Sequence, residues 1–189
     1  MKKVITAGVD EVGRGCLAGP VVSAAVVLKK GIDLRFLKDS KKISFKRRVE
    51  ISEHIIANSI YAIGMATVDE IFNLNILQAS LLSMKRALDN LSIKPGLTLI
   101  DGNFAPSGLK NFRTVIKGDE KIKVISAASI IAKVYRDRLM IKLSKEFANY
   151  AWDSNFGYGT KAHLEGLKKF GVTSHHRKCF KPVHKILSS

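Results

Sequence analysis

Cysteine, proline and long apolar runs are scarce in this 189-residue sequence. The two cysteines, Cys16 and Cys179, have no paired spacing, which argues against a disulfide framework and favours a reducing compartment. No apolar run approaches the ~20 residues of a membrane-spanning helix, and the run at residues 4–9 meets two acids at once, unlike a signal peptide. There is no repeat or Pro/Gly-rich linker. We therefore expect a cytoplasmic, single-domain protein that is neither secreted nor embedded in a membrane.

Acidic residues are half as frequent as basic ones. The 32 Lys and Arg residues against 16 Asp and Glu residues give a formal net charge of +16. A charge of this sign and size attracts polyanions, with an affinity that falls as salt rises. A solvated, lysine-rich surface produces the same balance, so charge alone does not decide whether nucleic acid is the partner.

The hydrophobic pattern predicts an α/β fold with a mixed sheet. Strands are predicted at residues 4–9, 20–28, 59–67, 97–100 and 112–116, and helices at residues 45–58, 75–91, 126–147 and 161–170. Ser44 and Thr160 are the expected N-caps of the first and last of these helices. We expect a core within residues 1–150, with residues 151–189 as a C-terminal segment of the same domain.

Two acids end the first predicted strand. Asp10 and Glu11 follow the apolar run, and a crossover joins this strand to the one at 97–100, which favours parallel neighbours. Asp101 is then expected beside Asp10 at the carboxyl edge of the sheet, where open α/β folds bind ligands. Clustered carboxylates need cations, and Mg²⁺ and Mn²⁺ prefer such hard oxygen ligands. A pair of these ions suits phosphodiester hydrolysis.

The residues alone leave alternatives at three of these positions. Asp101-Gly102 is also a turn signal, and Asp119 fits a solvated charged loop as well as a metal site. Regular strand geometry sends Asp10 and Glu11 to opposite faces. Glu11 must therefore lie beyond the strand end, bind through its backbone carbonyl or hold a metal-bound water.

Gly13, Arg14 and Gly15 follow the acids directly. An arginine between two glycines lets both the backbone and the guanidinium approach a ligand closely. Beside metal-binding acids, this loop suits a phosphodiester. Lys41 and Lys42 either contact substrate phosphates or form a solvated charge run.

Other polar residues have structural explanations. Asp137 lies about three turns into its helix, so an ion pair with Arg136, Arg138 or Lys133 is expected rather than metal binding. Ser126 is expected to cap its helix or to bond a neighbouring acid. Four histidines lie in the last 29 residues, but their spacing fits no familiar zinc pattern, which favours a basic segment that contacts nucleic acid.

Several blocks of the sequence resemble one known family. Residues 8–15 (GVDEVGRG) and 18–22 (AGPVV) are similar to the signature of bacterial type-2 ribonuclease H, ribonuclease HII. Further matching blocks follow in the order of the family at residues 39–42, 46–48, 75–79, 101–103, 117–119, 126–134, 157–161 and 176–177. Together these blocks extend from residue 4 to about residue 183.

The resemblance implies a ribonuclease H-like α/β fold, with a mixed five-stranded sheet flanked by helices and a small helical C-terminal segment. It implies an endoribonuclease with Mg²⁺ or Mn²⁺ in a two-metal site. Such an enzyme cleaves RNA in RNA–DNA hybrids and cuts 5′ of single ribonucleotides in duplex DNA, leaving 3′-hydroxyl and 5′-phosphate ends. Its work is ribonucleotide removal and RNA primer removal, in DNA repair and replication.

The resemblance also assigns roles to residues. The catalytic and metal-binding acids of the family fall on Asp10, Glu11, Asp101 and Asp119. Its loop that reads the ribose 2′-hydroxyl, the group that distinguishes RNA from DNA, falls on Gly13, Arg14 and Gly15. Its junction-sensing tyrosine falls on Tyr158, whose ring would pack on the next deoxyribose and disfavour an extra hydroxyl there.

Two alternatives compete with this interpretation. A non-catalytic basic protein that binds nucleic acid explains the charge but not acids at adjacent strand ends. Type-3 ribonuclease H resembles this chain in its core, but it carries an extra N-terminal domain and a different residue in place of the arginine. Here the first strand begins at Val4 and Arg14 is present. We expect a monomer that binds RNA–DNA hybrids and ribonucleotide-containing DNA duplexes, with no membrane partner.

Overall fold

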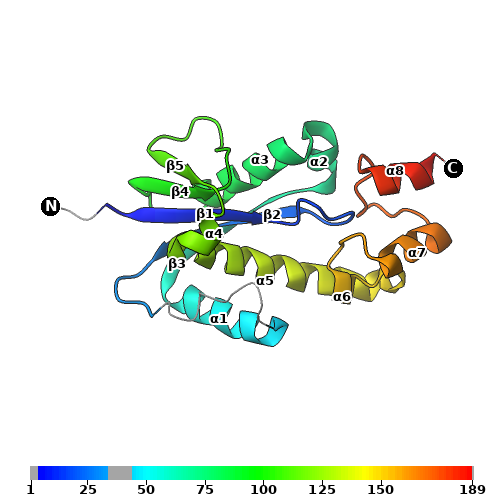
Figure 1. The fold of residues 1–189 in the computed structure, drawn as a ribbon, viewed down its shortest axis with the longest axis horizontal. Coiled ribbons are helices and arrows are strands. Elements are labelled where there is room, and N and C mark those ends of the chain that lie inside the picture. The colour runs from blue at the N-terminus through cyan, green and yellow to red at the C-terminus, as the bar shows by residue number, and fades with distance from the viewer. Residues whose placement is uncertain (1–3, 34–43, 189) are drawn as a thin grey trace.

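A five-stranded mixed sheet forms the centre of the computed structural model, which describes residues 4–33 and 44–188 (Figure 1). The strands, in the spatial order β3-β2-β1-β4-β5, are β3 (Ser59–Ala66), β2 (Val21–Leu28), β1 (Thr6–Val12), β4 (Leu97–Asp101) and β5 (Phe112–Val115). β2 pairs antiparallel with β1 and β3, whereas β4 pairs parallel with β1 and β5. The predicted parallel pairing of the first and fourth strands is confirmed.

Helices cover both faces of the sheet. The long ones are α1 (Phe45–Ala57), α3 (Ile76–Asp89), α5 (Lys123–Glu146) and α7 (Lys161–Phe170), and the short ones are α2 (Val68–Leu74), α4 (Gly118–Lys121), α6 (Trp152–Asn155) and α8 (Lys181–Leu187). α2 and α3 lie on one face, α1 and α5 lie on the other, and α6, α7 and α8 gather at one end (Figure 1). Every helix in the described ranges is too short or too polar to cross a bilayer.

The boundaries of the elements correct two predictions. β1 ends at Val12 rather than at residue 9, because its ladder with β2 continues through the acids to the pair Val12–Val22. α5 begins at Lys123, so Ser126 is not its N-cap. The short helices α2, α4, α6 and α8 were not predicted, since four to seven residues are too few for a clear period of 3.6.

The predicted helix caps are confirmed. The Ser44 hydroxyl accepts a hydrogen bond from the Arg47 N–H at 3.3 Å, and the Thr160 hydroxyl accepts one from the His163 N–H at 3.4 Å. These bonds satisfy N–H groups that the first turn of a helix leaves unpaired.

Side chains of β1 alternate between the two helical layers. Val9 packs with Met84 of α3 and Ile100 of β4, so odd positions of β1 face α3. Even positions face α5, which approaches very closely at Gly8, where an added Cβ would lie 2.3 Å from the Val124 carbonyl oxygen. Gly8 therefore allows the first turns of α5 to lie against β1, next to Asp10.

The C-terminal segment shares a core with the rest of the chain. Leu17 of the β1–β2 connection and Met140 of α5 cluster with Trp152, Leu167 and Val183. This packing fixes the loop after β1 against α5, α6 and α7, and therefore links the carboxyl edge of the sheet to the C-terminal helices.

Candidate active site

Asp10 and Asp101 stand side by side at the carboxyl edge of β1 and β4. The parallel register pairs Val9 with Ile100, so the next residues on each strand are the two aspartates. Because paired residues of parallel neighbours share a face, both carboxylates project toward α5. The sheet itself therefore brings together two acids that are 91 residues apart in sequence.

The environment of Asp10 penalises its charge. Burial raises the pKa of Asp10 well above its ordinary value, and the Glu11 and Asp101 carboxylates raise it further. A hydrogen bond from the Ser129 side chain and one from the Glu11 N–H at 2.7 Å act in the opposite direction. An acid in this setting gains most from a cation that restores its ionised form.

Glu11 lies inside β1, which excludes the predicted alternative in which it sits beyond the strand end. Alternation sends its side chain to the face opposite Asp10, yet the pKa of Glu11 is raised by burial and by Asp101. The Arg14 guanidinium contacts its Oε1 at 3.2 Å and lowers that pKa. Its Oε2 is buried and has no hydrogen-bond partner among the described residues.

Asp119 is placed beside Asp101 by the short helix α4. The Gly118 and Asp119 N–H groups donate to Asp101 Oδ1 at 2.6 and 3.3 Å. Gly118 is needed at this contact, because an added Cβ would lie 2.6 Å from Ile125 and 3.3 Å from that carboxylate oxygen. The fourth predicted acid thus reaches the same edge through its backbone, on the α5 side of the sheet.

Ser129 is the residue of this site that the sequence prediction missed. Its side chain is close enough to Asp10 to lower the pKa of that carboxyl, whereas the Ser126 hydroxyl is buried and has no partner among the described residues. Ser126 and Ser129 are one helical turn apart in a stretch of small residues, and that i, i+3 spacing was the available signal.

Two buried arginines hold the loop that follows the acids. Arg177 donates to the Arg14 and Gly19 carbonyls, each at 2.9 Å. Arg136 donates to the carbonyls of Ala18, Pro20 and Phe156 at 2.7 to 2.9 Å. Both arginines are fully buried, and their hydrogen bonds to these carbonyl groups partly compensate the cost of burying the two charges. Burial lowers the pKa of Arg177 to about 10.

Tyr158 faces this loop from the C-terminal segment. A Cβ added at Gly15 would lie 4.0 Å from the ring of Tyr158, and the Leu17 N–H donates to the Gly157 carbonyl at 2.7 Å. Burial raises the pKa of Tyr158 above its ordinary value. The structure therefore brings Gly13, Arg14, Gly15 and Tyr158 together, next to the acids.

The remaining predicted residues divide in two. Asp137 is fully buried and pairs with Lys133 at 2.8 Å, as expected, and with Arg48 at 3.8 Å. The predicted alternatives Arg136 and Arg138 are wrong, because Arg136 bonds carbonyl groups and Arg138 pairs with Glu53. Lys41 and Lys42 lie outside the described residues.

The acids fit a divalent cation by their chemistry. Asp10, Glu11 and Asp101 supply hard oxygen donors whose mutual repulsion a cation relieves, and the buried, unbonded Oε2 of Glu11 is an available acceptor. Between residues 4–33 and 44–188, no three Asp, Glu, His or Cys side chains form a ready-made coordination group. The acids are thus close neighbours rather than a closed shell.

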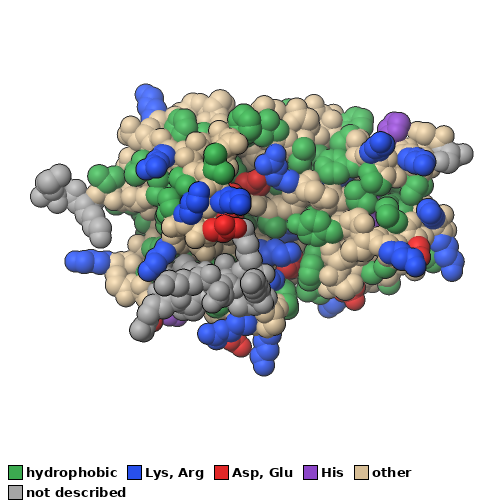
Figure 2. Space-filling view, in the orientation of Figure 1, with side chains coloured by type: hydrophobic (Ala, Val, Ile, Leu, Met, Phe, Trp, Pro, Cys, Tyr) green, Lys and Arg blue, Asp and Glu red, His purple; other side chains and the backbone are tan. Residues whose placement is uncertain are grey.

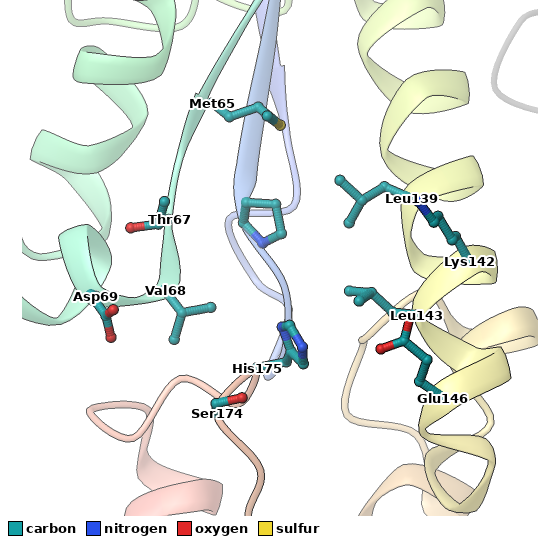
Figure 3. A pocket seen from close by; sticks show the side chains of 11 residues that line it. Met65, Thr67, Val68, Asp69, Leu139, Lys142, Leu143, Glu146, Ser174 and His175 are labelled. Carbon is teal, nitrogen blue, oxygen red and sulfur yellow. The ribbon is translucent and has the colours of Figure 1, made fainter.

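The acids belong to a strongly basic chain, with a net charge of +16. Lys and Arg side chains are spread over the face shown in Figure 2, and the few Asp and Glu side chains lie near its middle, along its lower edge and at its right-hand end. A separate pocket of about 600 Å³ lies between α2 and α5, lined by Met65, Val68, Leu139 and Leu143 among others (Figure 3). It contains none of the predicted site residues. A basic surface around these acids suits a polyanionic ligand.

Two histidines of the C-terminal segment are buried and neutral. Burial lowers the pKa of His163, and burial together with the neighbouring histidines lowers the pKa of His176 to about 3. The unfolded chain binds protons at these positions below pH 6.5 while the folded chain does not, so stability is complete above that pH and falls as the pH drops toward 3.

We expect the free energy of unfolding to fall on acidification with a slope that His176→Gln reduces by up to about 1.4 kcal/mol per pH unit. Urea unfolding of wild type and variant between pH 6.5 and 4.5 measures it, with His184→Gln, at an exposed position, as control. Equal slopes in wild type and His176→Gln would contradict the prediction.

The chain is similar to known proteins over almost its whole length. The family profile of ribonuclease HII matches residues 7–186. Ribonuclease HII of Pelagibacter ubique is 59% identical over 185 residues, which cover 97% of this chain and 99% of that protein. The crystal structure of ribonuclease H2 from Pyrococcus horikoshii superposes with a TM-score of 0.81 at 31% identity, over 97% of both chains.

The type-3 enzyme is a more distant relative. Bst-RNase HIII, solved in complex with Mn²⁺, has a TM-score of 0.73 at 18% identity, and the match covers 98% of this chain but 70% of that one. This likeness shows the common fold alone, whereas the profile and the curated relatives match the type-2 enzyme along nearly the whole chain. The chain therefore belongs to the ribonuclease HII family, and it is an endoribonuclease that acts on RNA–DNA hybrids.

Proposed function

We propose that this enzyme hydrolyses the phosphodiester bond on the 5′ side of ribonucleotides, including a single ribonucleotide embedded in duplex DNA, with divalent cations. The observation that carries the proposal is that the acids that would bind metal lie next to the residues that would recognise the ribose. The acids of β1 and β4 lie directly beside a loop and a tyrosine that can approach one nucleotide closely. Products with 3′-hydroxyl and 5′-phosphate ends follow from attack by water on the side away from the 3′ oxygen.

In this proposal Asp10, Glu11, Asp101 and Asp119 hold two ions, Mg²⁺ or Mn²⁺. When bound, such ions activate water and stabilise the leaving oxygen. Asp10 is the central ligand, since it is buried and both the Glu11 and Asp101 carboxylates act on its charge. Since Glu11 lies within β1 and alternates with Asp10, it contributes through its backbone carbonyl or by holding a metal-bound water with its Oε2, which is unbonded among the described residues.

The ribose is read by the loop and the tyrosine. Gly13 and Gly15 allow the backbone to approach the 2′-hydroxyl, and Arg14 is free to exchange its contact with Glu11 for a substrate phosphate. Tyr158, 39% exposed, presents its ring to the following sugar. A ring packed there favours a deoxyribose. The Gly13–Gly15 loop and Tyr158 together therefore select the junction between RNA and DNA.

The wider proposal follows from the substrate. Lys41, Lys42 and the basic residues of segment 151–189 contact the duplex backbone, and the enzyme works as a monomer in the cytoplasm on ribonucleotides and RNA primers left in DNA. The net charge of +16 supports binding to a polyanion and predicts a steep salt dependence.

Cleavage-site mapping tests the proposed function. Two end-labelled substrates of one sequence, a DNA duplex with one ribonucleotide and an all-RNA strand on DNA, are digested with Mg²⁺ or with Mn²⁺. The proposal predicts a single cut 5′ of the lone ribonucleotide and several cuts in the hybrid. Cleavage of the hybrid with an intact single-ribonucleotide duplex would overturn the junction activity while leaving the family's hybrid activity in place.

Arg14→Ala is expected to lower kcat/KM on the single-ribonucleotide duplex about tenfold more than on the hybrid. The reason is that a hybrid offers many registers and phosphate contacts, whereas a lone ribonucleotide must be gripped at one place; a charge-assisted bond contributes about 1.5–3 kcal/mol. Arg47→Ala, which removes an exposed guanidinium paired with Glu50, is the control. An equal loss on both substrates would show that Arg14 is only a phosphate clamp.

A further inference from the structure

The segment at residues 156–158, the tyrosine loop, has a strained backbone that neighbouring groups must hold in place. Phe156 and Gly157 have φ values of +52° and +85°, in the left-handed region that costs free energy for a residue with a side chain. Such a conformation persists only where neighbouring groups fix it. The Asn155 side chain accepts from the Gly157 N–H at 2.8 Å, and the Tyr158 carbonyl lies within bonding distance of both the Thr160 N–H and the side chain of His163.

A chain of hydrogen bonds runs through two buried histidines to the Tyr158 backbone. His163 Nδ1 lies 2.9 Å from the Tyr158 carbonyl oxygen, and His163 Nε2 lies 3.1 Å from His176 Nε2. The Trp152 indole N–H donates to His163 Nε2 at 3.1 Å. At the far end, the Thr173 N–H donates to His176 Nδ1 at 3.0 Å.

These contacts fix the proton on each ring. His163 Nε2 accepts from Trp152, so the proton of His163 is on Nδ1 and is donated to the Tyr158 carbonyl. His176 Nδ1 accepts from Thr173, so the proton of His176 is on Nε2 and is donated to His163. Every ring nitrogen is used, with the lone pair of His163 Nε2 shared between two donors, and both neutral rings are completely buried. These hydrogen bonds explain how two imidazoles can be buried in an apolar cluster, where the sequence predicted no role for them.

The residue next to His176 holds the other recognition loop. Arg177 donates to the Arg14 carbonyl, and its own N–H donates to the Leu17 carbonyl at 2.8 Å. A β-bridge also pairs His176 with Ala18. His176 is therefore linked through His163 to the Tyr158 carbonyl, and the neighbouring Arg177 is hydrogen-bonded to the Arg14 carbonyl.

We propose that His163 and His176 are positioning residues that fix Tyr158 relative to the Gly13–Gly15 loop. They touch no reacting atom and act through the Tyr158 carbonyl. The consequence for catalysis, which rests on the function proposed above for Tyr158, is that this pair sets the preference of the enzyme for an RNA–DNA junction over continuous RNA.

Two substitutions of one residue separate the relevant bond from the packing around it. The amide nitrogen of an asparagine occupies the position of Nδ1, so His163→Asn keeps a donor to Tyr158 and loses the bonds at Nε2. Glutamine reaches the position of Nε2, so His163→Gln keeps partners for Trp152 and His176 and loses the donor to Tyr158. Both variants replace the same buried imidazole with a flexible amide side chain, so each is a control for the packing lost in the other.

The first measurement is the ratio of kcat/KM on the single-ribonucleotide duplex to kcat/KM on the hybrid. We expect His163→Gln to lower this ratio about fivefold, the effect of one hydrogen bond of ordinary strength, and His163→Asn to keep it within about twofold of wild type. In a Tyr158→Ala background His163→Gln should change the ratio no further, as for two residues acting through one contact. An equal loss on both substrates, or additive losses, would overturn the proposal.

The second measurement does not depend on substrate choice. Fluorotyrosine labels all four tyrosines, and Tyr158→Phe identifies the ¹⁹F resonance of Tyr158. We expect His163→Gln, which loses the donor to Tyr158, to shift or broaden this resonance, and His163→Asn, which keeps that donor and loses only the contacts with Trp152 and His176, to shift it much less. An unchanged resonance in His163→Gln would refute the positioning role. If Tyr158→Ala leaves the ratio unchanged while the resonance responds as expected, the junction role of Tyr158 fails and the positioning pair stands.

A milder variant serves if both substitutions of His163 prevent folding. Thr173 is half-buried, and its hydroxyl lies 2.9 Å from His176 Nδ1. Thr173→Val removes this bond, together with the acceptor of the His175 N–H, with little change of volume, and we expect a smaller shift of the same ¹⁹F resonance in the same direction. No shift would contradict the proposal.

Discussion

Asp10→Asn is expected to lower kcat about a thousandfold or more while leaving the affinity for the substrate duplex within a few-fold of wild type. Asparagine keeps the shape of the side chain and an acceptor for the Glu11 N–H, but it removes the central negative charge of the site. The stabilisation that a bound cation supplies is several kcal/mol, and each ~1.4 kcal/mol corresponds to a factor of ten in rate.

Single-turnover cleavage and binding measured without cations separate these two effects. Asp89→Asn makes the same chemical change at an exposed residue paired with Lys85, and should cleave like wild type. Asp101→Asn should behave like Asp10→Asn, because its amide oxygen can still accept from Gly118 while the charge is lost. Near-normal turnover by either aspartate variant would show that the site is assigned wrongly.

Gly13→Ala is expected to destabilise the protein by about 2–4 kcal/mol and to reduce activity on every substrate. Gly13 has φ +91°, and an added Cβ would lie 2.2 Å from Nε of Arg136. Arg136 cannot move without releasing the carbonyls of Ala18, Pro20 and Phe156. The substitution therefore disturbs the ribose-reading loop and the tyrosine loop together.

Two other glycines provide controls for Gly13→Ala. Gly31 has a similar φ of +85° with nothing near its Cβ position, so Gly31→Ala should cost only about 1 kcal/mol of backbone strain. Gly15 has an ordinary φ, and its Cβ would make only one contact, at 4.0 Å. Gly15→Ala should leave thermal unfolding unchanged, so that any loss of activity reports a clash with substrate. Equal melting temperatures for Gly13→Ala and Gly31→Ala would contradict this account.

The sequence predicted the sheet and its long helices because those depend on local periodicity and on the handedness of one crossover. The position of Asp101 beside Asp10 followed from that topology, and the register of β1 and β4 confirms it. The predicted end of β1 was wrong for a physical reason. An acid pair reads as the end of an apolar strand, but the ladder with β2 continues wherever backbone partners are available.

Contacts between distant segments were beyond prediction. Nothing in the spacing of Arg136 and Arg177 shows that two guanidiniums turn inward to bond carbonyl groups, since arginines are usually exposed. The role of Ser129 rather than Ser126 depends on the rotation of α5 against Gly8, a tertiary contact. The C-terminal histidines were predicted to belong to a basic segment that contacts nucleic acid, but His163 and His176 lie in the core.

Binding of Mn²⁺ to the free enzyme tests the central claim most directly, because it isolates the acids from substrate recognition. Titration of metal-free protein, followed by the electron paramagnetic resonance signal of unbound Mn²⁺, gives the affinity and the number of ions bound. The account predicts saturable binding by wild type and by Asp89→Asn, and at least about tenfold weaker binding by Asp10→Asn, which loses one ionic ligand. Wild-type affinity in the Asp10→Asn protein would contradict it.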